Sequence, residues 1–168
     1  IPGTISLGYL EKVLCLLLRE GVPIRDMETI LETLGDHAGA LKDIDIVTEY
    51  VRQALKRTIT RRFAEANSLR VITVDPKVED TIVASVKKSE AGSCLAMDPD
   101  LIQKIVNITS GEIDKVKDVI PNIIILTSPI VRIYFKKLID QFIPNITVLS
   151  YSEIDNTAQI QAIGNIAM

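Results

Sequence analysis

The first part of the chain carries apolar residues at the three-and-four spacing of helices that bury one face. After Ser6, a stripe of leucines and valines runs as far as Gly21 and predicts a first helix. Asp26 can cap a second helix, because its carboxylate can accept from the free amides of a first turn. That helix is predicted to end at Gly35, so that residues 35–39 (GDHAG) form a loop.

A third amphipathic stretch follows this loop. Asp43 or Asp45 can open the helix, and its apolar positions continue from Ile46 to Phe63. Its opposite side carries charged residues: Glu49, Arg52, Lys56 and Arg57, with Arg61 and Arg62 close by. We therefore predict that residues 1–67 are all-α.

From Leu69 the pattern changes to short β-rich runs, each followed by helical spacing. Three runs end in junctions of the same kind: Asp75-Pro76, Asp98-Pro99 and Ser128-Pro129. In each junction the Asp or Ser side chain can cap the next helix, and proline suits the first helical position because its missing N–H would have no partner there. The helical stripe after the first junction extends to Val86, and strand candidates at 146–150 and 158–166 close the chain.

The resulting element order is β-α-β-α-β-α-β-β, and it defines the fold class. Short apolar strands such as IIIL (residues 123–126) look buried on both faces, which is typical of a parallel sheet covered by helices. We predict an α+β/α/β two-part chain: an all-α helical subdomain (1–67) followed by a small α/β subdomain with a mostly parallel sheet (68–168).

Charge and hydropathy exclude some partners. The net charge is −3, which provides no electrostatic footprint for nucleic acid or anionic lipid. The longest uninterrupted apolar run, residues 13–18, is far below the ~20 residues that span a bilayer. The basic cluster Lys56, Arg57, Arg61 and Arg62 allows three interpretations: a solvated face, a protein–protein contact or, without an aromatic platform, a nucleic-acid contact.

The sequence shows no pattern of residues typical of a catalytic site. His37 is its single histidine and is predicted to be a solvated loop residue rather than part of a triad. We expect no metal, since Asp43 and Asp45 lack the glycine and distal Glu of a calcium loop. A nucleotide is disfavoured because proline removes an amide at each βα turn. We interpret the acidic pairs Glu79/Asp80 and Asp98/Asp100 as carboxylates that cap or complement helix N-termini rather than as a general acid and base.

The two cysteines, Cys15 and Cys94, lie far apart in apolar contexts. We predict that both are reduced thiols buried in the core of a cytosolic protein rather than partners in a disulfide.

Several sequence blocks resemble a known family. VLCLLLREGVPIRDMETILETL (13–34) resembles the signature of the FHIPEP family of flagellar and type III secretion export-gate proteins. The blocks TEYVRQALKRTI (48–59), VITVDPKVED (71–80), IIILTSPIVRIYFKKLI (123–139) and VLSYSEI (148–154) follow in family order. The resemblance covers essentially the whole chain, and VITVDPKVED with LTSPIVR favours a flagellar rather than a virulence member.

This resemblance implies a function without catalysis or cofactor. Family members have a multi-pass membrane half and a cytosolic region of four subdomains, of which this chain resembles the third and fourth. The implied location is the cytoplasmic face of the inner membrane. The implied partners are like subunits in a ring, usually nonameric, other export-apparatus proteins, the ATPase complex and chaperone–substrate complexes. A virulence homologue, or a small-molecule or nucleotide-binding α/β module, is the alternative.

The family pattern also marks candidate interaction residues. Arg25, Asp26 and Glu32 match it in the first block, and Glu49 and Arg52 match it in TEYVR. Their expected role is helix capping and charge pairing, within one subunit or across a ring contact.

Overall fold

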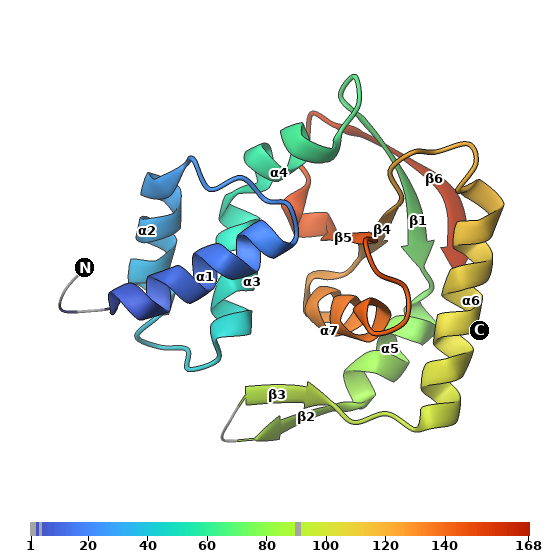
Figure 1. The fold of residues 1–168 in the computed structure, drawn as a ribbon, viewed down its shortest axis with the longest axis horizontal. Coiled ribbons are helices and arrows are strands. Elements are labelled where there is room, and N and C mark those ends of the chain that lie inside the picture. The colour runs from blue at the N-terminus through green and yellow to red at the C-terminus, as the bar shows by residue number, and fades with distance from the viewer. Residues whose placement is uncertain (1–2, 4, 90–91) are drawn as a thin grey trace. The chain divides into compact units, whose positions relative to one another are not determined.

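The chain divides into two compact units, each described here by itself. The computed structural model describes residue 3, residues 5–89 and residues 92–168 (Figure 1). The first unit consists of Ile1–Asn67 together with Ser152–Thr157, and the second of Ser68–Tyr151 with Ala158–Met168. Among the described residues, no helix is both long enough and apolar enough to cross a membrane.

The first unit is helical, as predicted. Its helices are α1 (Leu7–Arg19), α2 (Met27–His37), α3 (Ile44–Ala54) and α4 (Lys56–Phe63). Three N-caps act through their side chains: Ser6 accepts from the amide of Tyr9, Asp26 from Thr29, and Asp43 from Asp45. α3 packs against α1 and α2, and its apolar face meets theirs in a core of fully buried aliphatic side chains: Val13, Leu17, Ile30, Leu34, Val47 and Val51.

Helix α2 is longer than its sequence pattern predicts. The expected loop at 35–39 is wrong for its first three residues, because α2 continues through Gly35 to His37. The reason is tertiary: the imidazole of His37 stacks on the ring of Tyr50 in α3, with 4.3 Å between ring centroids and 10° between planes. His37 is therefore a half-buried helical residue rather than a solvated loop histidine.

The predicted third helix is two helices. Its apolar stripe is continuous, but α3 ends at Ala54 and α4 begins at Lys56. At the junction, the amide of Leu55 donates to the carbonyls of both Val51 and Arg52, the tightened pattern of a helix end. No glycine or proline marks this break, so the sequence alone gives no sign of it.

The second unit contains the predicted parallel sheet. Strands β1 (Ser68–Val74), β4 (Ile124–Thr127), β5 (Thr147–Ser150) and β6 (Gln159–Ile166) pair in the order β5-β4-β1-β6, and every pair is parallel. Helices α5 (Pro76–Ala84), α6 (Pro99–Val116) and α7 (Pro129–Asp140) accompany it, and the 3-10 turn η1 (Tyr151–Glu153) follows β5. The core lies between sheet and helices, with Ile72, Ile125 and Phe135 fully buried. The mixed helical and parallel α/β fold class is confirmed.

One predicted element does not belong to this sheet. The strand at CLAM becomes β3 (Gly92–Leu95), which pairs antiparallel with β2 (Val86–Ser89) in a separate two-stranded sheet. Val86, predicted on a helical stripe, instead opens β2, because α5 ends at Ala84. Pairing between neighbouring segments closes only a short loop, so the local hairpin has a low entropic cost.

Two of the three predicted side-chain caps in this unit are confirmed. Asp75 accepts from the amide of Lys77 and Asp98 accepts from that of Asp100. The prediction for Ser128 is wrong, because its side chain makes no capping bond. Its own amide donates instead to Glu79 Oε1 at 3.4 Å, so a carboxylate from α5 lies at the start of α7.

Both cysteines are free, as predicted, but neither is in the core. Cys15 is exposed because it lies two positions from the buried Val13 and Leu17, on the opposite side of α1. Cys94 is exposed on the short strand β3. The expectation of buried thiols was wrong because an apolar sequence context does not determine which face of a helix or strand a residue occupies.

Candidate functional site

The most specific polar contact of the helical unit joins α3 to the turn after β5. The guanidinium of Arg52 donates through Nε to Glu153 Oε2 at 3.2 Å and through Nη2 to Oε1 at 2.7 Å. Both residues are 1% exposed. This is the two-point geometry in which arginine and carboxylate bind most strongly. The TEYVR and VLSYSEI blocks of the sequence therefore meet in one buried ion pair.

A second carboxylate lies near the same guanidinium. Arg52 Nη1 is 3.7 Å from Glu20 Oε2 and makes no hydrogen bond within the described part of the chain. Glu49, in the turn of α3 before Arg52, is also buried. Glu49 and Arg52, predicted on the charged side of this helix, are thus both buried, and Arg52 meets Glu153 there.

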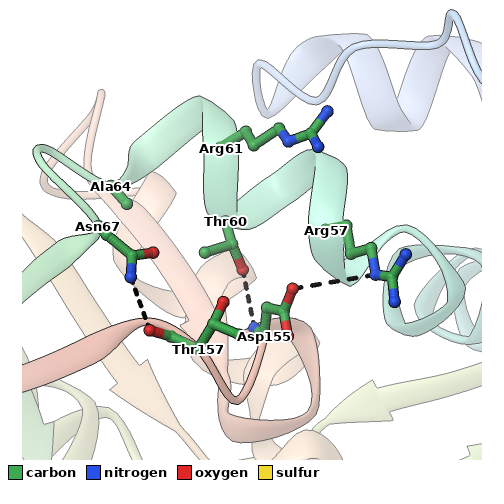
Figure 2. Close-up of a pocket in the computed structure, with 7 residues that line it drawn as sticks. All are labelled: Arg57, Thr60, Arg61, Ala64, Asn67, Asp155 and Thr157. Atoms are coloured by element: carbon green, nitrogen blue, oxygen red, sulfur yellow. Dashed lines mark hydrogen bonds and ion pairs between the residues drawn. The ribbon is translucent and has the colours of Figure 1, made fainter.

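Hydrogen bonds fix the 152–157 segment along α4. Thr60 is the central contact: its hydroxyl donates to the carbonyl of Glu153 at 3.4 Å and accepts from the amide of Asp155 at 2.9 Å. At the far end, Asn67 Nδ2 donates to the carbonyl of Thr157 at 2.7 Å. Figure 2 shows the Thr60–Asp155 and Asn67–Thr157 hydrogen bonds. The segment is thus held at both of its ends and at its middle.

A cavity of about 530 Å³ lies between α4 and this segment. Its lining residues are Arg57, Thr60, Arg61, Ala64, Asn67, Asp155 and Thr157 (Figure 2). Arg57 and Asp155 form a long ion pair across it, with 3.9 Å between Nε and Oδ2, and the arginine side chain is 82% exposed. The cavity combines arginine donors with amide and carboxylate acceptors.

The predicted interaction residues separate into different places. Arg52 lies in the buried ion pair and Arg57 lines the cavity, whereas Lys56 is exposed and is not among its lining residues. Arg25 and Glu32 are exposed on the α2 side of the unit. Motif membership therefore does not group these residues into one site.

Asp26 has the capping role that the sequence predicted. Its Oδ2 accepts from the hydroxyl of Thr29 at 2.7 Å and its Oδ1 accepts from the Thr29 amide at 3.2 Å. These two hydrogen bonds, the side-chain bond first, lower the pKa of Asp26 below its ordinary value of 3.8.

Sequence reasoning missed several residues of this region. They are Glu20, Thr60, Asn67, Glu153 and Asp155. Glu153 lies within the recognised VLSYSEI block, so its presence was visible, but its partner was not. In the described residues, no group of three or more His, Cys, Asp or Glu side chains could hold a metal ion.

Comparison with known proteins identifies the family of the chain. The FHIPEP family model matches residues 1–159. The chain is 40% identical over 164 residues to the flagellar biosynthesis protein FlhA of Bacillus subtilis (strain 168), an alignment that covers 97% of this chain and 24% of FlhA. The chain thus spans about a quarter of the length of this relative.

Solved structures agree with the sequence comparison. The CdsV protein of Chlamydia pneumoniae superposes with a TM-score of 0.88 at 35% identity, covering 98% of this chain and 47% of that one. The nonameric SctV-C of EPEC superposes with a TM-score of 0.85 at 30% identity, covering 97% of this chain and 49% of that one. On its sequence and on the fold of its two units, the chain belongs to the FHIPEP family.

Proposed function

We propose that this chain is the C-terminal cytosolic part of the inner-membrane export gate of a flagellar type III protein secretion system. The observation that carries the proposal is the 40% identity to FlhA across 97% of the chain. In this proposal the helical unit is the third cytosolic subdomain of the family and the α/β unit is the fourth. The chain then lies at the cytoplasmic face of the inner membrane, below a multi-pass membrane half.

The proposed role is that of an assembly and docking platform. Like subunits form a homo-oligomeric ring, which the nonameric assembly of the similar SctV-C supports. The ring receives chaperone–substrate complexes and contacts other export-apparatus proteins, including the ATPase complex.

We propose that the chain itself is not an enzyme. A nucleotide site in an α/β fold uses free amides at helix N-termini. Here the N-terminal amides of α5 and α6 already donate to the carboxylates of Asp75 and Asp98, and Glu79 reaches the start of α7. A phosphate at any of these turns would meet negative charge, which supports a platform over a nucleotide-binding module.

The Arg52–Glu153 pair has a role inside one subunit in this proposal. Both residues are 1% exposed, so neither side chain can reach a neighbouring subunit without leaving its partner. A buried pair that loses one member leaves an uncompensated charge, which is strongly unfavourable. We therefore assign the pair to holding the 152–157 segment in place, and we assign ring or partner contacts to the exposed Arg25, Glu32 and Lys56.

A chimera tests this function. The corresponding segment of B. subtilis FlhA is replaced by these 168 residues, and swimming and the secretion of flagellar proteins are measured in a strain that lacks its own FlhA. We expect export to be restored. A chimera that is present in the membrane at the normal level but exports nothing would contradict the proposal.

A variant with substitutions at exposed positions tests whether these residues act in partner binding rather than in folding. The triple substitution Arg25→Ala, Glu32→Ala and Lys56→Ala in the chimera changes only exposed positions. Reduced export with an unchanged melting temperature of the purified segment is the result expected for interaction residues. Full export by this triple variant would remove them from the proposal while leaving the platform role standing.

A further inference from the structure

The cavity beside α4 has no role in the function proposed above. Arg57 and Arg61 are one helical turn apart in α4, and both line the cavity. Like charges at this spacing repel each other. A carboxylate bound between them would relieve that repulsion and could accept from either guanidinium.

The acceptors in the cavity narrow the choice of ligand. Asn67 uses Nδ2 to donate to the carbonyl of Thr157, and this leaves its Oδ1 as a possible acceptor for a ligand N–H. Asp155 adds a carboxylate to the same wall. A phosphodiester has only hydrogen-bond acceptors. It could accept from the arginines, but it would have no donor for Asn67 Oδ1 and would be repelled by the Asp155 carboxylate. A peptide offers backbone N–H donors together with side-chain carboxylates and matches the whole lining.

Size and surroundings favour the same ligand. A volume of about 530 Å³ exceeds what a single ion needs and lies in the range of sites for drug-sized ligands. Among the described residues, no large exposed hydrophobic side chain lies between residues 56 and 67, so α4 offers no apolar anchor to a bilayer. Arg62 lies over the ring of Phe63, 5.3 Å from its centroid, rather than in the cavity lining.

We propose that the cavity lined by Arg57, Arg61, Asn67 and Asp155 is a docking site for an acidic peptide segment of a partner protein. Carboxylates of the segment bind the two guanidinium groups, and one of its backbone N–H groups donates to Asn67. Asp155 competes with the ligand for Arg57, because its Oδ2 lies 3.9 Å from Arg57 Nε. This inference goes beyond the export function proposed above, and it is tested by peptide binding to the purified chain rather than by export.

The test is fluorescence anisotropy with the purified chain and a labelled glutamate-rich peptide. Substituting Arg57→Ala and Arg61→Ala together should weaken binding by about tenfold or more, as expected for lost hydrogen bonds to charged groups. Asp155→Asn should tighten binding by up to about fivefold, the size of one exposed ion pair. Circular dichroism of each variant confirms that the fold is retained.

Matched controls decide the outcome. The double variant Arg19→Ala and Arg62→Ala removes the same charge from exposed positions of the helical unit outside the cavity lining, and it should change the affinity little. If both double variants weaken peptide binding equally, the affinity depends on the total positive charge rather than on the cavity, and the proposed site is overturned. Equal binding of a peptide with glutamine in place of glutamate would overturn it as well. Preferential binding of anionic vesicles or of single-stranded DNA would replace the peptide by a membrane or a nucleic acid.

Discussion

Arg52 and Glu153 form a buried ion pair with two hydrogen bonds although 101 positions separate them in the chain. Glu153 follows the edge strand β5 of the α/β unit in the sequence, yet residues 152–157 group with the helical unit. The pair therefore binds residues 152–157, which lie between two strands of the α/β unit in the sequence, to helix α3 of the helical unit. Two charges removed from water are tolerated here because each neutralises the other at hydrogen-bonding distance.

Removing one member of this pair should be costly. Arg52→Met should lower the free energy of unfolding by about 3–5 kcal/mol, because it leaves the Glu153 carboxylate buried without the guanidinium that binds it at two points. Glu153→Gln should cost less, since Glu20 stays close to the Arg52 guanidinium. The combination of Arg52→Met with Glu153→Leu should cost less than the sum of the single changes. Urea unfolding followed by circular dichroism measures these differences.

The exposed ion pair of the same segment is the control. Arg57→Met with Asp155→Asn breaks a 3.9 Å contact whose arginine is 82% exposed, and it should change the free energy of unfolding by less than about 1 kcal/mol. If Arg52→Met lowers the free energy of unfolding no more than Arg57→Met with Asp155→Asn does, burial of the Arg52–Glu153 pair does not determine its strength.

Thr60→Val should loosen the 152–157 segment. The substitution keeps the side-chain shape but removes the hydroxyl that accepts from the amide of Asp155, and an unsatisfied amide costs about 1–3 kcal/mol. Hydrogen exchange at Asp155 should accelerate accordingly. Thr58→Val, on the same helix at a half-buried position, is the comparison and should leave that amide protected.

The cap at Asp26 predicts a pH dependence of stability. Hydrogen bonds from Thr29 lower the pKa of the folded-state carboxyl below 3.8, so the unfolded chain binds this proton more readily. The stabilisation is complete above the ordinary pKa and disappears as the pH falls through the lower, folded-state value. The difference in melting temperature between the parent chain and Asp26→Asn should therefore shrink as the pH drops below about 4.

The same titration with Thr29→Ala identifies the cause. Without the Thr29 hydroxyl, the larger of the two contributions to the pKa shift is lost. The effect of Asp26→Asn on the melting temperature should then depend less on pH than it does in the parent chain. An unchanged pH profile in the Thr29→Ala background would show that this hydrogen bond is not what shifts the pKa.

Ala66 should be a site of backbone strain. It has φ of 49°, in the left-handed region where an L side chain costs about 1–2 kcal/mol and glycine costs little. Ala66→Gly should raise the free energy of unfolding by about 0.5–1 kcal/mol after the greater freedom of the unfolded glycine is subtracted. Thermal unfolding measures the change.

Ala64→Gly is the matched comparison, since Ala64 has an ordinary extended conformation with φ of −76°. Ala64→Gly relieves no strain in the folded state. It should lower the free energy of unfolding, because glycine has more conformational freedom in the unfolded chain. A loss of stability in both glycine variants would mean that the turn at Ala66 is not strained.

Most of the helical unit and the parallel sheet could be predicted because their signals are local. The cap at Asp26 and the Asp-Pro junctions at Asp75 and Asp98 act within three residues along the chain. Short apolar strands predicted a sheet buried by helices, and the family blocks predicted the relatives. These features need no knowledge of which distant residues meet.

Only the tertiary structure decided which distant residues pair with each other. Stacking of His37 on Tyr50 extends α2 beyond its glycine, and a local hairpin takes β3 away from the parallel sheet. The sequence by itself determined most of the elements and the family, through periodicity, capping and motif order. The fold decided that Arg52 is buried against Glu153, because the stability of a charge away from water depends on which group lies beside it in space.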